Sequence, residues 1–134
     1  LEVYSDDPND LSTLSYDEFM NAYRDIIKKS CALLKDDRFA CFVVGDIRDK
    51  KGIYRNFVSD TIAAFLDSGL HLYNEAVLIT PGGTLALRVG KQFKASRKLG
   101  KGHQNVLVFV KGCPKKATAF CGDVNVMEVD EGEA

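Results

Sequence analysis

The sequence lacks the short motifs with which many α/β enzymes bind nucleotides. It contains neither a GxGxxG dinucleotide fingerprint nor a GxxxxGK[ST] phosphate-binding loop. Its two histidines, His71 and His103, are far apart in the sequence, which argues against a metal site. No Ser-His-Asp or Cys-His arrangement is suggested by local sequence, although such groups can meet in space. No catalytic or metal-binding residue can therefore be named from a motif.

Cysteine pairs of the metal-binding type and long apolar runs are also missing. Cys31, Cys41, Cys113 and Cys121 form no C-x-x-C pair, and two of them lie in apolar surroundings. We expect reduced cysteines that pack as small core residues of a cytoplasmic protein, with a pair of disulfides as the alternative. No apolar run approaches the roughly 20 residues that a membrane-spanning helix needs, and we expect no signal peptide at the start.

What the sequence does contain is a strong segregation of charge. Its 134 residues are 46% hydrophobic and 28% charged, as is typical of one packed domain, and the net charge is −1. Residues 80–104, between two apolar runs, carry no acidic residue. The cations of this stretch are Arg88, Lys91, Lys94, Arg97, Lys98 and Lys101, with His103 beside them. A charge run is often only a solvated face, but loops of this length are usually functional or disordered. We predict a surface that binds a polyanion.

The pattern of apolar residues predicts helices that alternate with strands. Ser15 and Glu18 form a capping box that starts a helix, and an apolar stripe at helical spacing continues to Leu34. Residues 39–44 are continuously apolar, which predicts a strand buried on both faces. Residues 54–66 predict a second amphipathic helix, and Gly69 supplies its left-handed stop.

Residues 70–79 and 105–110 predict two further strands. The order of elements implies a right-handed parallel crossover between the first two strands, followed by a long basic loop. Three strands are few for such a sheet, so we expect part of a larger one. The edge of residues 39–44 would then be covered by the N-terminal segment or by a second copy of the chain. Ligands of open α/β sheets gather at the carboxyl ends of the strands, where Asp46 lies. Asp46 has two possible roles. It either takes part in a ligand site, or it has a structural role in which it caps a turn or pairs with Arg48.

Four stretches of the sequence resemble a known family. YSDDPNDLS, VGDIRDKKGIYRNF, GLHLYNEAVLIT and RVGKQFKASRKLGKGHQNVLVFVKG are similar to DNA amino-methyltransferases of phages and mobile elements. The resemblance spans residues 1–116 and implies a partial catalytic domain there. Residues 117–134 form an acidic tail, in which the residue pattern allows one short strand at 124–127. The resemblance implies the downstream half of a Rossmann-like, S-adenosylmethionine-dependent methyltransferase sheet. Residues 39–44, 70–79 and 105–110 would be its fifth, sixth and seventh strands, and the seventh would lie antiparallel between the other two.

The resemblance also implies that this chain carries DNA-contacting residues but not the catalytic or cofactor-binding ones. The family's Pro-Pro-Tyr catalytic motif and its glycine-containing cofactor loop have no match here. We therefore expect no catalytic residue in this chain, little affinity for S-adenosylmethionine, and no activity without an upstream part of the same polypeptide. The six cations would contact DNA, helped by Gln92, Phe93 and Ser96. The rim of the target-base pocket would comprise Asp46, His103, Gln104 and Asn105. Two alternatives are a non-catalytic module for nucleic-acid binding or assembly, and an α/β domain whose basic loop has no role.

Overall fold

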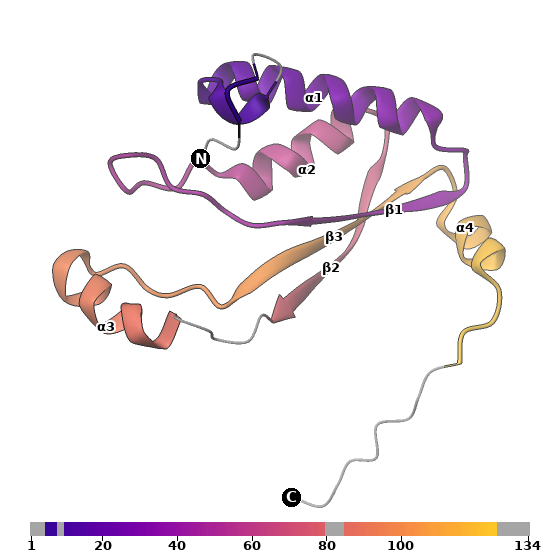
Figure 1. Ribbon diagram of the computed structural model, residues 1–134. Coiled ribbons are helices and arrows are strands. Elements are labelled where there is room, and N and C mark those ends of the chain that lie inside the picture. The colour runs from indigo at the N-terminus through magenta and orange to yellow at the C-terminus, as the bar shows by residue number, and fades with distance from the viewer. Residues whose placement is uncertain (1–4, 8–9, 80–84, 126–134) are drawn as a thin grey trace, which may run out of the picture.

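Three β-strands form one sheet in which the last strand of the chain lies in the middle (Figure 1). The structure is a computed structural model that describes residues 5–7, 10–79 and 85–125. The strands are β1 (Arg38–Val44), β2 (His71–Ile79) and β3 (His103–Lys111), in the order β1-β3-β2. β3 is antiparallel to both neighbours, so β1 and β2 are parallel to each other. This topology confirms the α/β class and the central antiparallel strand that the resemblance implied.

Helices precede, connect and follow the strands. They are the short 3-10 helix η1 (Leu11–Thr13), α1 (Tyr16–Leu33), α2 (Phe57–Asp67), α3 (Leu85–Ser96) and α4 (Pro114–Cys121). The predicted capping box starts α1: the Glu18 backbone N–H donates to Ser15 Oγ at 3.4 Å, and the Ser15 backbone N–H donates to Glu18 Oε2 at 3.0 Å. Gly69 ends α2 with φ of 86°, in the left-handed region that an L side chain rarely adopts.

The core lies between the sheet and the pair α1 and α2, which cover one face of it (Figure 1). Phe109 and Leu107 of β3 are fully buried there, and the rings of Phe65 and Phe109 stack with 4.1 Å between centroids. Thr61 of α2 is also fully buried. Its hydroxyl donates to the Phe57 carbonyl at 2.8 Å and lies 3.1 Å from the Tyr23 hydroxyl, so one polar group joins α1 to α2 without an unpaired atom.

The other face of the sheet has little cover in the part of the chain that the structure describes. Cys41 and Val43 of β1 point to this face and are exposed, Val43 by 49%. The prediction that residues 39–44 are buried on both faces is therefore wrong for these two positions, because α1 and α2 lie only on the face of Ala40, Phe42 and Val44. β3 is the one described partner of β1. Residues 5–7 and 10–14 do not pair with the free edge of β1, and residues 1–4 and 8–9 lie outside the described chain.

The stretch predicted to be one long basic loop contains a helix instead. α3 occupies Leu85–Ser96, with Leu85, Val89 and Phe93 at helical spacing. The chain after it folds back on its apolar side: a Cβ at Gly100 would lie 2.7 Å from Val89 Cγ2 and 3.3 Å from Leu85 Cδ1. That close approach, which only glycine allows, gives α3 an apolar partner from its own following segment.

Two further elements differ from the expectations. The apolar face that was expected to begin at Tyr54 belongs to α2 only from Phe57 onwards, and Tyr54 lies in a hairpin before it. α4 spans the predicted boundary at 116 and packs on β1 and β3, with Ala117 buried. The short strand predicted at 124–127 is not formed at residues 124–125, and residues 126–127 lie outside the described chain.

The four cysteines are free thiols in different environments. Cys31 is in the core, where burial raises the pKa of its thiol. Cys41 was expected in the core as well, but it is exposed on the uncovered face of β1. Within the described residues, no helix is both long and apolar enough to cross a membrane, and no three metal-ligating side chains form a group.

The central strand should dominate the stability of the chain. Phe109→Ala removes a fully buried ring, so we expect the free energy of unfolding in urea to fall by about 3–5 kcal/mol. Phe120→Ala is the matched control, because the Phe120 side chain is 64% exposed, and it should cost less than about 1 kcal/mol. Equal losses for the two variants would contradict this description of the core.

Candidate functional site

Asp46 follows β1 directly and connects two elements. Its Oδ1 accepts a hydrogen bond from the backbone N–H of Val58 at 3.3 Å, in the first turn of α2. Its Oδ2 lies 3.6 Å from the ammonium of Lys101, and both side chains are about three-quarters buried. Asn56, which precedes α2 in a left-handed conformation, makes no side-chain cap of its own. Asp46 thus caps α2 from outside the helix and pairs with Lys101, not with Arg48.

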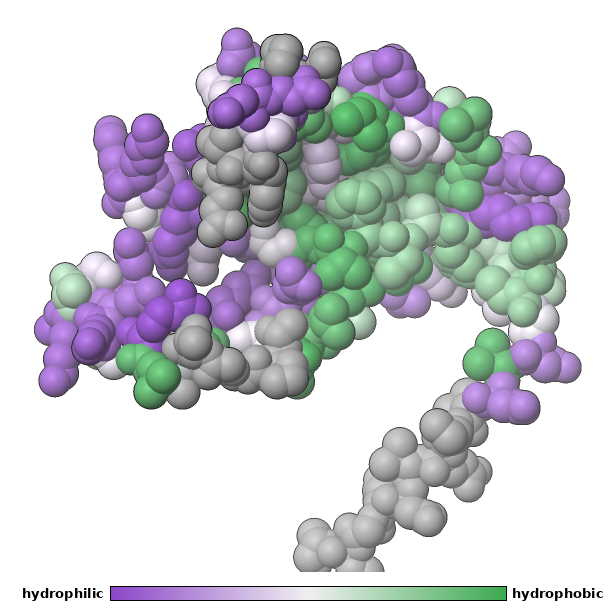
Figure 2. Space-filling model, viewed as in Figure 1, coloured by the Kyte–Doolittle hydropathy of each residue, from purple (hydrophilic) through white to green (hydrophobic). Residues whose placement is uncertain are grey.

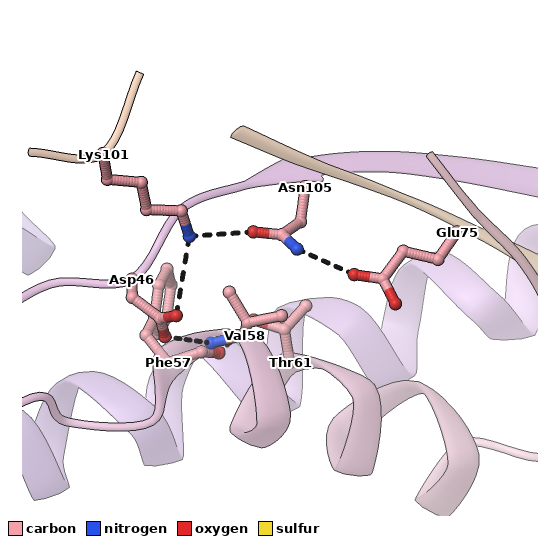
Figure 3. Close-up of polar contacts among 7 residues, drawn as sticks. All are labelled: Asp46, Phe57, Val58, Thr61, Glu75, Lys101 and Asn105. Carbon is pink, nitrogen blue, oxygen red and sulfur yellow. Dashed lines mark hydrogen bonds and ion pairs between the residues drawn. The ribbon is translucent and has the colours of Figure 1, made fainter. Parts of the chain in front are cut away.

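The contacts of Asp46 continue across the sheet (Figure 3). Lys101 Nζ also donates to Asn105 Oδ1 at 3.0 Å, and Asn105 Nδ2 donates to Glu75 Oε1 at 2.7 Å. The amide of Asn105 is thereby fixed in orientation, with its oxygen toward the ammonium and its nitrogen toward the carboxylate. The result is a polar chain Asp46–Lys101–Asn105–Glu75 that joins the end of β1, the start of β3 and the middle of β2.

The topology explains why these residues meet. β3 is antiparallel to β1, so Asn105 near the start of β3 is the register partner of Val44 at the end of β1. Gln104 lies next to the same point, because a Cβ at Gly45 would be 3.9 Å from Gln104 Cγ. His103 is the register partner of Ile79, at the end of β2, and lies on the same face of β3 as Asn105, two residues later. Of the four residues predicted for the rim of a base pocket, Asp46 and Asn105 are joined through Lys101, and Gln104 points to the opposite face of the strand.

Five of the six predicted DNA-contacting cations lie on α3 or just after it. Arg88, Lys91 and Lys94 are exposed on the helix. Arg97 has φ of 56° and donates to the carbonyls of Phe93 at 3.0 Å and Lys94 at 3.2 Å, so it closes the carboxyl end of α3. None of these four, nor Lys98, forms an ion pair with a residue that the structure describes. The sixth, Lys101, is already engaged by Asp46 and Asn105.

The loop between β1 and α2 is held in place by α1. Tyr16, the first residue of α1, donates to Asp60 Oδ2 at 2.7 Å and lies 3.1 Å from the Arg55 carbonyl. Burial and the hydrogen bond to Asp60 raise the pKa of Tyr16, so its hydroxyl stays a donor over the whole neutral range. The guanidinium of Arg55 lies 4.6 Å from the Tyr16 ring centroid. The segment that carries Asp46 and Arg48 is therefore fixed at its far end.

Sequence reasoning missed two contributors to this site. Glu75 is the single acidic residue in the apolar run of β2, and that isolated charge was the signal that could have identified it. The role of Lys101 had no local signal, because Asp46 and Asn105 come from different strands.

Comparisons with known proteins support the fold. No protein-family model matches the sequence, and no curated protein matches it. One solved structure is similar, that of a proposed DNA modification methylase from Thermus thermophilus, with a TM-score of 0.58 and 13% sequence identity. The similarity covers 73% of this chain and 38% of that protein, so this chain spans well under half of its length. At this identity the likeness shows the fold alone: the chain shares the architecture of part of that structure.

The two contacts of Asp46 should be separable by substitution. Asp46→Asn keeps an oxygen for the Val58 N–H but loses the charge opposite Lys101, so we expect a loss of less than about 1 kcal/mol in unfolding free energy. Asp46→Ala also loses the cap and should cost about 1–2 kcal/mol. Urea denaturation of both variants checks this, with exposed Asp67→Ala as the control. If the Asn and Ala variants are equally stable, the cap has no energetic role.

Proposed function

We propose that this chain is the downstream part of the catalytic domain of a DNA methyltransferase. The intact enzyme would transfer a methyl group from S-adenosylmethionine to an exocyclic amino group of adenine or cytosine. One observation carries the proposal: β3 lies antiparallel between two parallel strands, in a chain whose fold is similar to part of a proposed DNA modification methylase. The cations of α3, at the carboxyl end of β2, supply the second line of support.

The open side of the sheet supports the idea of a partial domain. An apolar groove of about 210 Å³ runs between α1 and β1, lined by Ile26, Ile27, Leu34, Ala40 and Phe42 among others. Figure 2 shows hydrophobic residues gathered in this region, and the Ile26 side chain is 50% exposed. An additional strand beside β1 would satisfy its free backbone groups and cover the groove. We propose that the upstream part of the same polypeptide supplies that strand, and a second copy of the chain is the alternative occupant.

We propose that the residues described in the structure do not by themselves bind S-adenosylmethionine. The carboxylate at the end of β1, Asp46, has both oxygens engaged, by the Val58 N–H and by Lys101. The family's glycine-containing cofactor loop has no counterpart in the sequence. Binding of the cofactor and methyl transfer are therefore assigned to the upstream part, and this chain contributes the DNA-facing side.

That contribution would be to hold DNA and the displaced base. Arg88, Lys91 and Lys94 are exposed, unpaired within the described chain, and suited to phosphate groups. Gln104 and the Asp46–Asn105 pair lie at the neighbouring strand ends, where an extruded base would need polar contacts. We propose that Lys101 positions Asp46 and Asn105 for this purpose instead of contacting phosphate directly.

The assignment to DNA is tested by the salt dependence of binding. Each phosphate neutralised contributes about −0.9 to the slope of log K against log salt on duplex DNA. Lys91→Ala with Lys94→Ala should therefore reduce the magnitude of the slope by up to about 2, measured by fluorescence anisotropy with a short duplex. Lys28→Ala with Lys29→Ala removes the same charge from α1 and should leave the slope unchanged. A slope that does not respond to the α3 substitutions would remove this helix from the DNA contact.

The reaction itself is tested on the intact protein. DNA from cells that express it should contain N6-methyladenine or N4-methylcytosine, detected by mass spectrometry of the nucleosides, and this chain alone should yield neither. Adding a separately expressed upstream part should restore methylation to the chain. Salt-dependent DNA binding by an intact protein that methylates no DNA would favour the other candidate, a non-catalytic nucleic-acid-binding module.

A further inference from the structure

The loop between β1 and α2 carries a second group of cations that the DNA-contacting set above does not include. Its residues 48–54 form a hairpin in which Arg48 and Tyr54 are bridged, and the Asp49 N–H donates to the Ile53 carbonyl at 2.8 Å. The Ile53 N–H donates in turn to Asp49 Oδ1 at 2.9 Å. These local hydrogen bonds, together with the hold of Tyr16 on Arg55, make the hairpin a defined structure that presents Arg48 and Lys51.

A pocket of about 520 Å³ separates this hairpin from the carboxyl end of α3. One wall contains Arg48, Lys51 and Tyr54, and the other contains Ser96, Arg97 and Lys98. Four cations thus line one pocket, with no acidic residue in its walls. None of them forms an ion pair with any residue in the described ranges. Figure 2 shows hydrophilic side chains over both the hairpin and α3.

The two walls approach each other closely. A Cβ at Gly52 would lie 2.6 Å from Lys98 Nζ, and Gly52 has φ of 87°, so its lack of a side chain leaves the space that the ammonium occupies. Arg48 is fixed by its donation to the Gly52 carbonyl at 2.8 Å and by stacking, with Cζ 3.8 Å from the Tyr54 ring centroid. A preorganised guanidinium and an ammonium therefore meet from two segments nearly 50 residues apart in the sequence.

Structural roles account for part of this cluster, and Arg48 itself is held within its hairpin by the Gly52 carbonyl and the Tyr54 ring. Arg97 and Lys98 stabilise the carboxyl end of α3, where positive charge complements the helix dipole. Arg48 and Lys51 are on a separate segment and have no such role toward α3. Bringing four like charges to one pocket raises the energy of the folded state unless an anion enters it.

We propose that this pocket binds a backbone phosphate of a nucleic-acid strand, at a site separate from the exposed face of α3 and from the Asp46–Asn105 rim. The pocket adjoins the end of α3, whose 12 residues span about 18 Å. A strand that follows the cations of α3 would reach the pocket after about five nucleotides, at about 3.4 Å of rise each. The site depends on the proposed DNA substrate and does not depend on methyl transfer.

The experiment uses the full chain with the same fluorescent duplex and salt titration. Arg48→Ala with Lys51→Ala should reduce the magnitude of the salt slope by about 1, as loss of one phosphate contact requires, with Lys28→Ala and Lys29→Ala as the control of equal charge. Lys51→Ala alone should reduce the magnitude of the slope by up to about 1. Because this substitution removes no described backbone contact, it controls for distortion of the hairpin. Circular dichroism of each variant confirms that the fold is kept.

The outcomes separate this inference from the proposed function. A slope that falls for the α3 variant but not for Arg48→Ala with Lys51→Ala overturns the pocket and leaves the DNA substrate standing. If the slope is unchanged in both the α3 variant and the pocket variant, the pocket and the DNA substrate are both overturned. Inorganic phosphate at constant ionic strength should displace no more DNA than chloride does. Millimolar phosphate could instead displace DNA from the wild-type chain but not from the double variant. That result would identify a site for free phosphate and overturn the assignment to a nucleic-acid strand.

Discussion

β3 lies between β1 and β2 and runs antiparallel to both, and most of the remaining structure follows from that placement. As the central strand it has backbone partners on both sides, and its Leu107 and Phe109 are the most completely buried residues of the core. Its reversed direction brings its first residues to the carboxyl ends of the other two strands. The connection from β2 to β3 therefore begins and ends at the carboxyl ends of β1 and β2, and it carries α3 and Lys101 there.

The sequence predicts those features whose causes are local. The capping box of α1, the stop at Gly69 and the three strands were all correctly located from patterns within a few residues. α3 was missed although Leu85, Val89 and Phe93 recur at helical spacing, because the glycines and cations of the stretch are also typical of a loop. The exposure of Cys41 was missed because an apolar residue in a strand does not reveal whether a helix covers it.

Asp46 shows that local sequence patterns also do not reveal which residues of the site contact one another. Its position after a strand indicated either a cap or a functional carboxylate, and the structure gives it a cap on α2 and an ion pair with a residue 55 positions away. The sequence showed the cations from Arg88 to Lys101 as a cluster, but it did not show which of them form ion pairs. Lys101 is paired with a carboxylate because it lies just before β3, whose first residues are beside the end of β1, whereas Arg97 and Lys98 form no ion pair within the described chain.

The cations of the chain are consequently gathered at one end of the sheet. The loop before α2, the end of α3 and the start of β3 all lie at the carboxyl ends of β1 and β2, and α4 packs at the opposite end (Figure 1). Exposed apolar residues lie along β1, beside the groove under α1, and along β2, and some also lie at the charged end, such as Ile53, Leu87 and Leu99. A charged end is stable in water, but an open strand edge beside an apolar groove gains stability when another chain segment covers it. In the described chain the edge of β1 is therefore the place where a covering segment would add most stability, whereas the cationic end needs no such cover.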